Sequence, residues 1–102
     1  MTYKLFIDDE RFPVTDDWII ARSSKEAIHI LYHQGMPSEI AFDHDLGGDD
    51  TSMKFCHALF EYMAATPAYV PAGFKYSIHS QNPIGAQNIS GYMDQLLTLF
   101  ND

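Results

Sequence analysis

The order of apolar segments along the chain is the feature that most constrains its fold. Four short segments are rich in aromatic or β-branched residues, as buried strands are, and after the first connector they alternate with longer segments of helical periodicity. The expected strands span residues 3–7, 18–22, 39–43 and 74–78. Such alternation is typical of a mostly parallel sheet whose faces are covered by helices. We therefore expect an α/β fold, a small three-layer sandwich with a four-stranded sheet.

Three segments have the apolar spacing of amphipathic helices. The first is preceded by serines at 23–24, and Glu26 stands three residues after the first of them, as in a capping box. The second begins at Thr51, and Pro67 and Pro71 bracket its end. The third carries the longest apolar stripe in the chain and is expected to close the domain.

The charge balance excludes several classes of partner. Fourteen acidic residues against six basic ones give a net charge of -8 with the histidines neutral. Duplex nucleic acid and anionic membranes are bound by clustered Lys and Arg, whereas the basic residues here stand singly. Acidic residues near the start occupy the place of a signal peptide's apolar stretch, and no apolar run approaches the ~20 residues of a membrane span. We expect one cytoplasmic domain over residues 1–102, with its single cysteine, Cys56, in the core.

Polar residues collect where three of the expected strands end. Asp8 and Asp9 follow the first strand, residues 43–45 follow the third, and residues 79–82 follow the fourth. Ligands of open α/β sheets bind beyond the carboxyl ends of the strands. Acidic residues placed together there repel one another unless a cation or a proton relieves the repulsion. The sequence therefore predicts a binding site at this edge of the sheet.

Carboxylate oxygens without thiolates suit a hard divalent cation, Mg²⁺ or Mn²⁺. The candidate ligands are Asp8, Asp9, Asp43 and Asp45. Successive strand residues point to opposite faces, so Asp8 and Asp9 both reach an ion only if the strand has already turned into its loop. If the third strand stays extended through residue 45, Asp43 and Asp45 share a face and His44 points away. In that case one of the two sets is structural.

The segment after the fourth strand supplies groups that a metal ion lacks. His79 can transfer protons near neutral pH, and Ser80 offers a hydroxyl. Asn82 precedes Pro83 and is the natural N-cap of the last helix, whose free backbone N–H groups favour a phosphate. A cation site beside a phosphate cradle predicts phosphoester chemistry on a small phosphorylated ligand.

Four motifs in this order resemble the cyclic-phosphate processing receiver-like domain. They are Leu5–Arg11, Arg22–Ala27, Phe42–Gly47 and Ile78–Pro83, and the resemblance runs from about residue 3 to about residue 89. The family is similar to response-regulator receivers, so the resemblance implies a receiver-like, truncated flavodoxin-like fold. It also implies that Asp8 and Asp9 form the acidic pair that binds Mg²⁺, and that Asp43 occupies the phosphoacceptor position.

Departures from the receiver pattern favour hydrolysis over phosphorelay. Receivers carry a Lys after a fifth strand that contacts the phosphoryl group, whereas this sequence has no evident fifth strand and no basic residue after Lys75. The first connector is too short for the first helix of a receiver. His44, Asp45 and His79 add acid–base groups that a phosphoacceptor does not need. We expect a metal-dependent phosphoesterase acting on a cyclic nucleotide or a 2′,3′-cyclic end.

In this hypothesis His79 moves the proton, Ser80 orients the phosphate, and Asp43 either holds the ion or acts as the nucleophile. His44 or Asp45 completes the surroundings of the ion. Two other functions stay open: a catalytically inactive receiver-like module that binds a phosphorylated ligand or a partner protein, and a structural acidic module. Trp18 could stack a base, but its apolar segment favours a packed indole.

Overall fold

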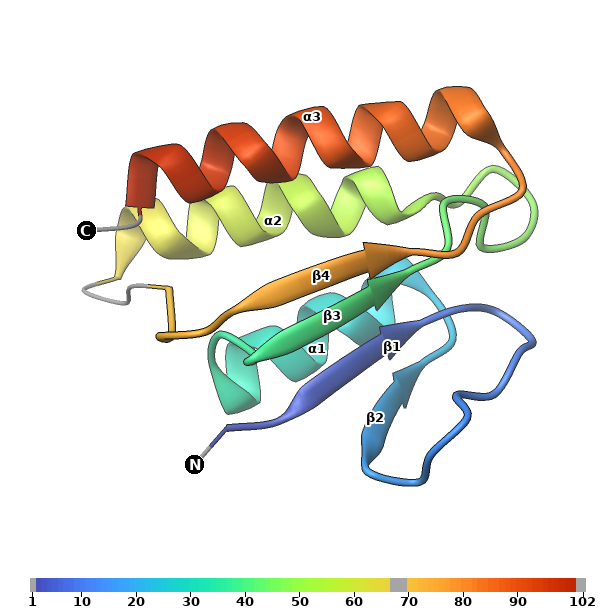
Figure 1. Ribbon diagram of the computed structural model, residues 1–102, viewed down its shortest axis with the longest axis horizontal. Coiled ribbons are helices and arrows are strands. Elements are labelled where there is room, and N and C mark those ends of the chain that lie inside the picture. Colours follow the sequence, from blue (N-terminus) through green and yellow to red (C-terminus); the bar gives the residue numbers. More distant parts are fainter. Residues whose placement is uncertain (1, 67–69, 101–102) are drawn as a thin grey trace.

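The computed structural model describes residues 2–66 and 70–100. The elements are β1 (Lys4–Ile7), β2 (Trp18–Ala21), α1 (Ser24–Gln34), β3 (Glu39–Phe42), α2 (Ser52–Ala65), β4 (Lys75–Ile78) and α3 (Pro83–Phe100). All four strands are parallel and lie in the order β2-β1-β3-β4 (Figure 1). The predicted α/β fold with a four-stranded sheet is confirmed, and the strands begin and end within one residue of their expected positions.

The register of the sheet brings the carboxyl ends of β1, β3 and β4 level with one another. Ile7 pairs with Phe42, and Phe42 pairs with Ile78. The backbone continues this pairing for one further step: Asp43 N donates to the Ile7 carbonyl at 2.9 Å, and His79 N donates to the Phe42 carbonyl at 2.8 Å. Residues that follow three separate strands therefore meet at one edge of the sheet.

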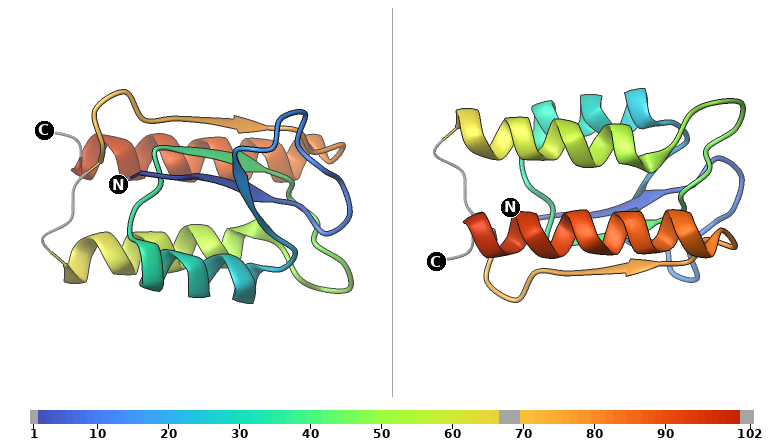
Figure 2. Two further views of the ribbon diagram at one scale, coloured as in Figure 1. Left: turned by 90° about the horizontal axis from the view of Figure 1, so that it is seen from below. Right: turned by 90° about the horizontal axis from the view of Figure 1, so that it is seen from above.

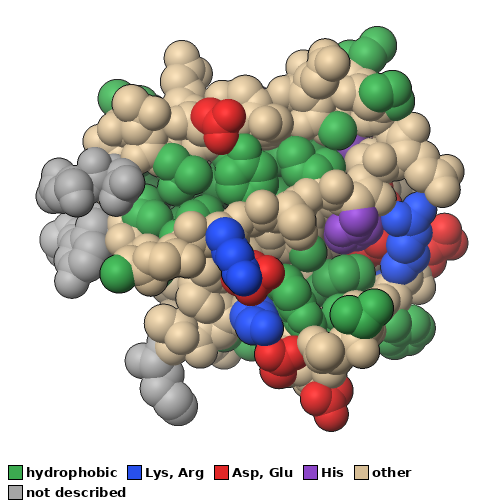
Figure 3. All heavy atoms as spheres, in the orientation of Figure 1, with side chains coloured by type: hydrophobic (Ala, Val, Ile, Leu, Met, Phe, Trp, Pro, Cys, Tyr) green, Lys and Arg blue, Asp and Glu red, His purple; other side chains and the backbone are tan. Residues whose placement is uncertain are grey.

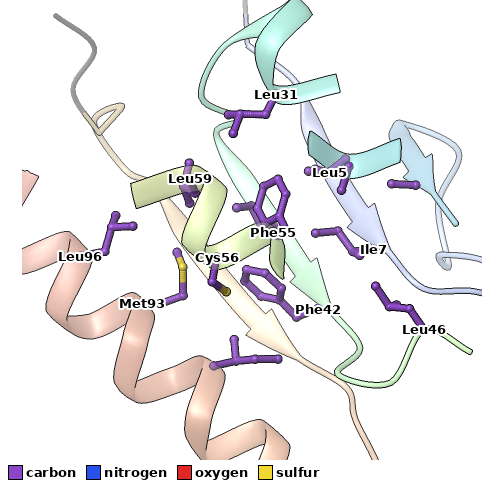
Figure 4. Packing of buried hydrophobic residues seen from close by; sticks show 14 of the residues in the cluster. Leu5, Ile7, Leu31, Phe42, Leu46, Phe55, Cys56, Leu59, Met93 and Leu96 are labelled. Carbon is purple, nitrogen blue, oxygen red and sulfur yellow. The ribbon is translucent and has the colours of Figure 1, made fainter. Parts of the chain in front are cut away.

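The core lies between the sheet and the helices. Leu5, Ile7 and Phe42 are fully buried on the helix-facing side of the sheet, and the ring of Phe42 packs against Phe55 of α2 with centroids 6.2 Å apart (Figure 4). Each such side chain contributes about 1.5–3 kcal/mol through burial. Cys56 is buried in this core as expected, and burial raises the pKa of its thiol to about 12.

The helices do not divide equally between the two faces of the sheet. α1 and α2 cover one face, and α3 lies beside α2 along the β4 edge (Figure 2). Within the described residues no helix covers the opposite face of the sheet, which is called the open face below (Figure 1). This face carries Phe6, Trp18 and Ala41. The outer layer of the expected sandwich is therefore incomplete, because the connector 8–17 contains Pro13 and is too short to form a helix that crosses the sheet.

Two predicted helix starts are confirmed by their caps. Ser23 Oγ accepts a hydrogen bond from Glu26 N at 3.0 Å, and Asn82 Oδ1 accepts one from Gly85 N at 3.0 Å. Pro67, expected near the end of the second helix, lies outside the described residues. None of the described helices is long and apolar enough to span a bilayer.

Candidate metal and phosphate site

Asp8 is fully buried where β1 turns into its loop. Its Oδ1 accepts hydrogen bonds from the backbone amides of Glu10 and Arg11, both at 2.9 Å, and its Oδ2 lies 2.9 Å from Nε2 of His79. Burial favours the neutral acid, but the two amides and His79 together hold the pKa of Asp8 below its ordinary value. An ionised carboxylate can only accept hydrogen bonds, so Nε2 of His79 carries a proton.

Asp8, Asp9 and Asp43 form one cluster, in which one carboxylate oxygen of each lies within 4.8 Å of the others. The early turn after Ile7 is what allows both Asp8 and Asp9 to reach it, as the sequence analysis required. Burial, and then the negative charge of Asp8, raise the pKa of Asp43. Three repelling carboxylates fit a hard divalent cation such as Mg²⁺.

Asp45, the fourth predicted ligand, lies outside this cluster. Its Oδ1 is 2.9 Å from Nδ1 of His44, and its Oδ2 accepts a hydrogen bond from Asn82 Nδ2 at 3.5 Å. The hydrogen bond with His44 lowers the pKa of Asp45. β3 ends at Phe42, so residues 43–45 are not one extended segment, and Asp45 instead forms an isolated bridge with Thr51.

A polar cavity of about 530 Å³ lies at this edge of the sheet. Asp9, Asp43 and Asp45 line it from the loops after β1 and β3, and Ser80 and Asn82 line it from the segment between β4 and α3. Ser80 Oγ accepts a hydrogen bond from Asn82 N at 3.0 Å. The cavity therefore combines carboxylates with a hydroxyl, an amide and the start of a helix.

Arg11 is the one basic residue among the described residues that line this cavity, and the sequence analysis did not single it out. Its Nη1 donates to the His79 carbonyl at 2.9 Å, and its Nε lies 4.0 Å from Oδ2 of Asp8. Arg22 Nη1 donates to the carbonyls of Asp8 and Arg11, which holds this loop against β2. The sequence signal for Arg11 was its position three residues after Asp8. The turn that begins at Asp8 places the backbone amide of Arg11 within hydrogen-bond distance of the Asp8 carboxylate.

The chain matches the model of the cyclic-phosphate processing receiver domain over residues 3–95. It belongs to this family. The match includes every predicted site residue, and it confirms the relationship inferred from the four motifs. A search of curated proteins found no match.

As a receiver-like domain of the cyclic-phosphate processing family, the chain brings together three acidic residues from the carboxyl ends of β1 and β3. These are Asp8, Asp9 and Asp43, the members of the carboxylate cluster. Within the described residues the domain has four strands, so a lysine following a fifth strand has no counterpart here. Arg11 places a different cation at the same edge of the sheet.

His79 of this receiver-like domain lies between the acidic cluster and the open face of the sheet. Its ring stacks on Phe6 with centroids 5.0 Å apart and planes 10° apart. It lines a groove on the open face and is absent from the lining of the polar cavity. The predicted proton-transfer residue therefore contacts the acidic cluster through Oδ2 of Asp8. His44, by contrast, packs its ring against Gly85 at the start of α3.

Proposed function

We propose that this domain is a divalent-metal-dependent phosphoesterase that hydrolyses a cyclic phosphate, either a cyclic nucleotide or a 2′,3′-cyclic end. The observation that carries the proposal is the carboxylate cluster of Asp8, Asp9 and Asp43 beside a cavity that also contains Arg11. Carboxylates alone would repel a phosphate. A cluster able to hold a cation, together with one arginine, makes the cavity suitable for an anionic ester.

Asp8, Asp9 and Asp43 would hold Mg²⁺ or Mn²⁺. A divalent ion bound there supplies Lewis acidity, which lowers the pKa of bound water and polarises a phosphoryl oxygen. Asp8 is held in place by hydrogen bonds to both of its oxygens. Asp9 is exposed and Asp43 half-buried, so both are open to a ligand in the cavity.

Arg11 and Ser80 are placed to bind and orient the phosphate. Nη1 of Arg11 is anchored on the His79 carbonyl, whereas Nη2 has no hydrogen bond to any described residue and is free to donate to an ester oxygen. Ser80 can donate its hydroxyl proton because its oxygen accepts from Asn82 N. The start of α3 lies next to these groups and favours negative charge.

His79 is the proposed proton acceptor. Nε2 of His79 donates to Asp8, so Nδ1, which has no hydrogen bond to the described residues, is the nitrogen open to a proton. Because the ring lines the groove on the open face and not the polar cavity, this role applies to an ester that extends over both hollows. The carboxylate thus orients the histidine as the acid does in a catalytic triad. In a second version of the mechanism a carboxylate oxygen of Asp43 attacks phosphorus, the ring P–O bond breaks, and the released oxygen takes a proton to become a hydroxyl; water then hydrolyses the aspartyl-phosphate ester and restores Asp43.

Turnover of cyclic nucleotides and 2′,3′-cyclic phosphates tests the proposal. Wild type, Asp8→Asn and Asp43→Asn are incubated with each ester in Mg²⁺, Mn²⁺ or EDTA, and products are separated by chromatography. Asp16→Asn is the matched control, because Asp16 lies in the connector outside the cavity and loses the same charge. We expect metal-dependent product from wild type and the control, and none from the two site variants. Full activity in both folded site variants refutes the proposal.

A receiver-like module that binds a phosphorylated ligand or a partner protein without turnover is the second candidate. The observation in its favour is Oδ2 of Asp8, which is occupied by His79 and is therefore less available to an ion. Calorimetric titration separates the two functions. Saturable binding of a cyclic phosphate with no product after prolonged incubation supports the binding module.

A further inference from the structure

The open face of the sheet carries an apolar groove of about 330 Å³ next to the acidic site. Phe6 and Ala41 form its floor, and Trp18 and Phe12 form its walls. Trp18 packs edge-on against Phe6 with centroids 6.0 Å apart, so the predicted packed indole faces this groove and not the main core. Figure 3 shows hydrophobic side chains gathered on this face beside a histidine, with charged side chains at the edge.

Phe12, one wall of the groove, is a large apolar side chain that folding leaves mostly exposed. It is 75% exposed, and its ring is held from one side by the guanidinium of Arg22, 4.7 Å from the ring centroid. A large exposed aromatic ring beside a hollow is typical of a surface that receives another flat group. The next residue but one, Val14, is also fully exposed and lines the same groove.

The groove and the polar cavity are adjacent parts of one surface. Arg11 lines both of them. His79 lines the groove while its Nε2 contacts Asp8 of the carboxylate cluster. A ligand whose phosphate lies in the cavity therefore directs any substituent on the Arg11 side into a hollow walled by aromatic rings.

We propose that this groove is the subsite for a planar aromatic group, such as a nucleobase, carried by the same ester whose phosphate occupies the polar cavity. The inference rests on the proposed function and narrows its substrates to aromatic, nucleoside-type cyclic phosphates. A neutral flat ring suits the groove because Phe12 and Trp18 offer ring surfaces above the buried floor of Phe6 and Ala41, and stacking on such rings accepts any base. Arg11, at the junction, is placed to contact both the phosphate and the ring.

Trp18 allows a direct test because it is the only tryptophan in the chain and forms part of the groove. Uridine 2′,3′-cyclic phosphate and glycerol 1,2-cyclic phosphate share the same five-membered cyclic phosphodiester, but only the first carries a base. Each is mixed with wild type in Mg²⁺, and tryptophan fluorescence is read before turnover. We expect the uridine ester to change the Trp18 emission and to bind about tenfold more tightly than the glycerol ester.

Two variants and one control locate the effect. Phe12→Ala should abolish most of the preference for the uridine ester, and Phe12→Tyr should retain it, because tyrosine keeps an aromatic face. Tyr32→Ala is the control: this tyrosine is 57% exposed on α1, outside the groove, and its loss should leave both affinities unchanged. Equal binding of the two esters without a change in Trp18 emission, or an unaltered preference in Phe12→Ala, overturns the inference while leaving the proposed function intact. Failure of both esters to bind refutes the proposed function and the subsite with it.

Discussion

Replacing Asp43 with asparagine should stabilise the metal-free domain and remove its response to Mg²⁺. Asp43 is half-buried beside the ionised Asp8, and burial together with that neighbouring charge raises its pKa. Asparagine keeps the shape of the side chain and removes the charge. The backbone bonds that position this residue, from Asp43 N to Ile7 and from Ser52 Oγ to the Asp43 carbonyl, do not involve the carboxylate.

The size of the effect follows from the geometry of the cluster. Two unit charges 4.8 Å apart, the largest separation of the carboxylate oxygens in the cluster, repel by about 3.5 kcal/mol at an effective dielectric constant of about 20. Solvent around Asp43 reduces this figure, so we expect a gain of about 1 kcal/mol, or about 4–8 °C in Tm. Wild type with Mg²⁺ at about ten times its Kd gains about 1.4 kcal/mol. Asp43→Asn should therefore have the higher Tm without metal, and wild type the higher Tm when Mg²⁺ is added.

Thermal unfolding in EDTA, Mg²⁺ and Mn²⁺ measures this reversal. Asp16→Asn controls for the change in net charge and should behave as wild type does in all three conditions, because Asp16 lies away from the cluster. The reasoning is refuted if Asp43→Asn unfolds below wild type in EDTA. It is equally refuted if Mg²⁺ stabilises Asp43→Asn as much as it stabilises wild type.

Two further predictions concern pH and packing. In EDTA, the stability advantage of Asp43→Asn over wild type should grow as the pH rises from 3.8 through the raised pKa of Asp43. The reason is that Asp43 binds its proton more tightly in the folded wild type than in the unfolded chain, so losing that proton destabilises the fold. Urea titrations that show a constant difference between the two proteins contradict this prediction. Gly85→Ala should cost about 1–3 kcal/mol in urea unfolding, because its Cβ would lie 2.4 Å from Cγ of His44. Gly91→Ala on the same helix, where nothing lies within 4 Å, should not destabilise and is the control.

The position of the site could be predicted from the sequence, whereas the places of Asp45 and His79 within it could not. Apolar periodicity located each strand. The carboxyl ends of neighbouring parallel strands lie at the same edge of the sheet, so Asp8 and Asp43 were expected close together. Where Asp45 points depends on how the chain bends after Phe42, which periodicity does not report. The direction of His79 depends on Phe6, a residue on another strand that stacks with its ring.

The open face of the sheet follows from a short connector, and its consequence reaches the site. A helix between β1 and β2 would cover Phe6 and Trp18, but residues 8–17 form a loop that leaves them facing a groove. Asp8 belongs to the carboxylate cluster, and its Oδ2 lies 2.9 Å from Nε2 of His79, which lines the groove and stacks on Phe6. In the proposed function, an ion coordinated by Oδ2 of Asp8 must share this oxygen with His79. Asp8 is then the residue through which the contents of the cavity and of the groove affect each other.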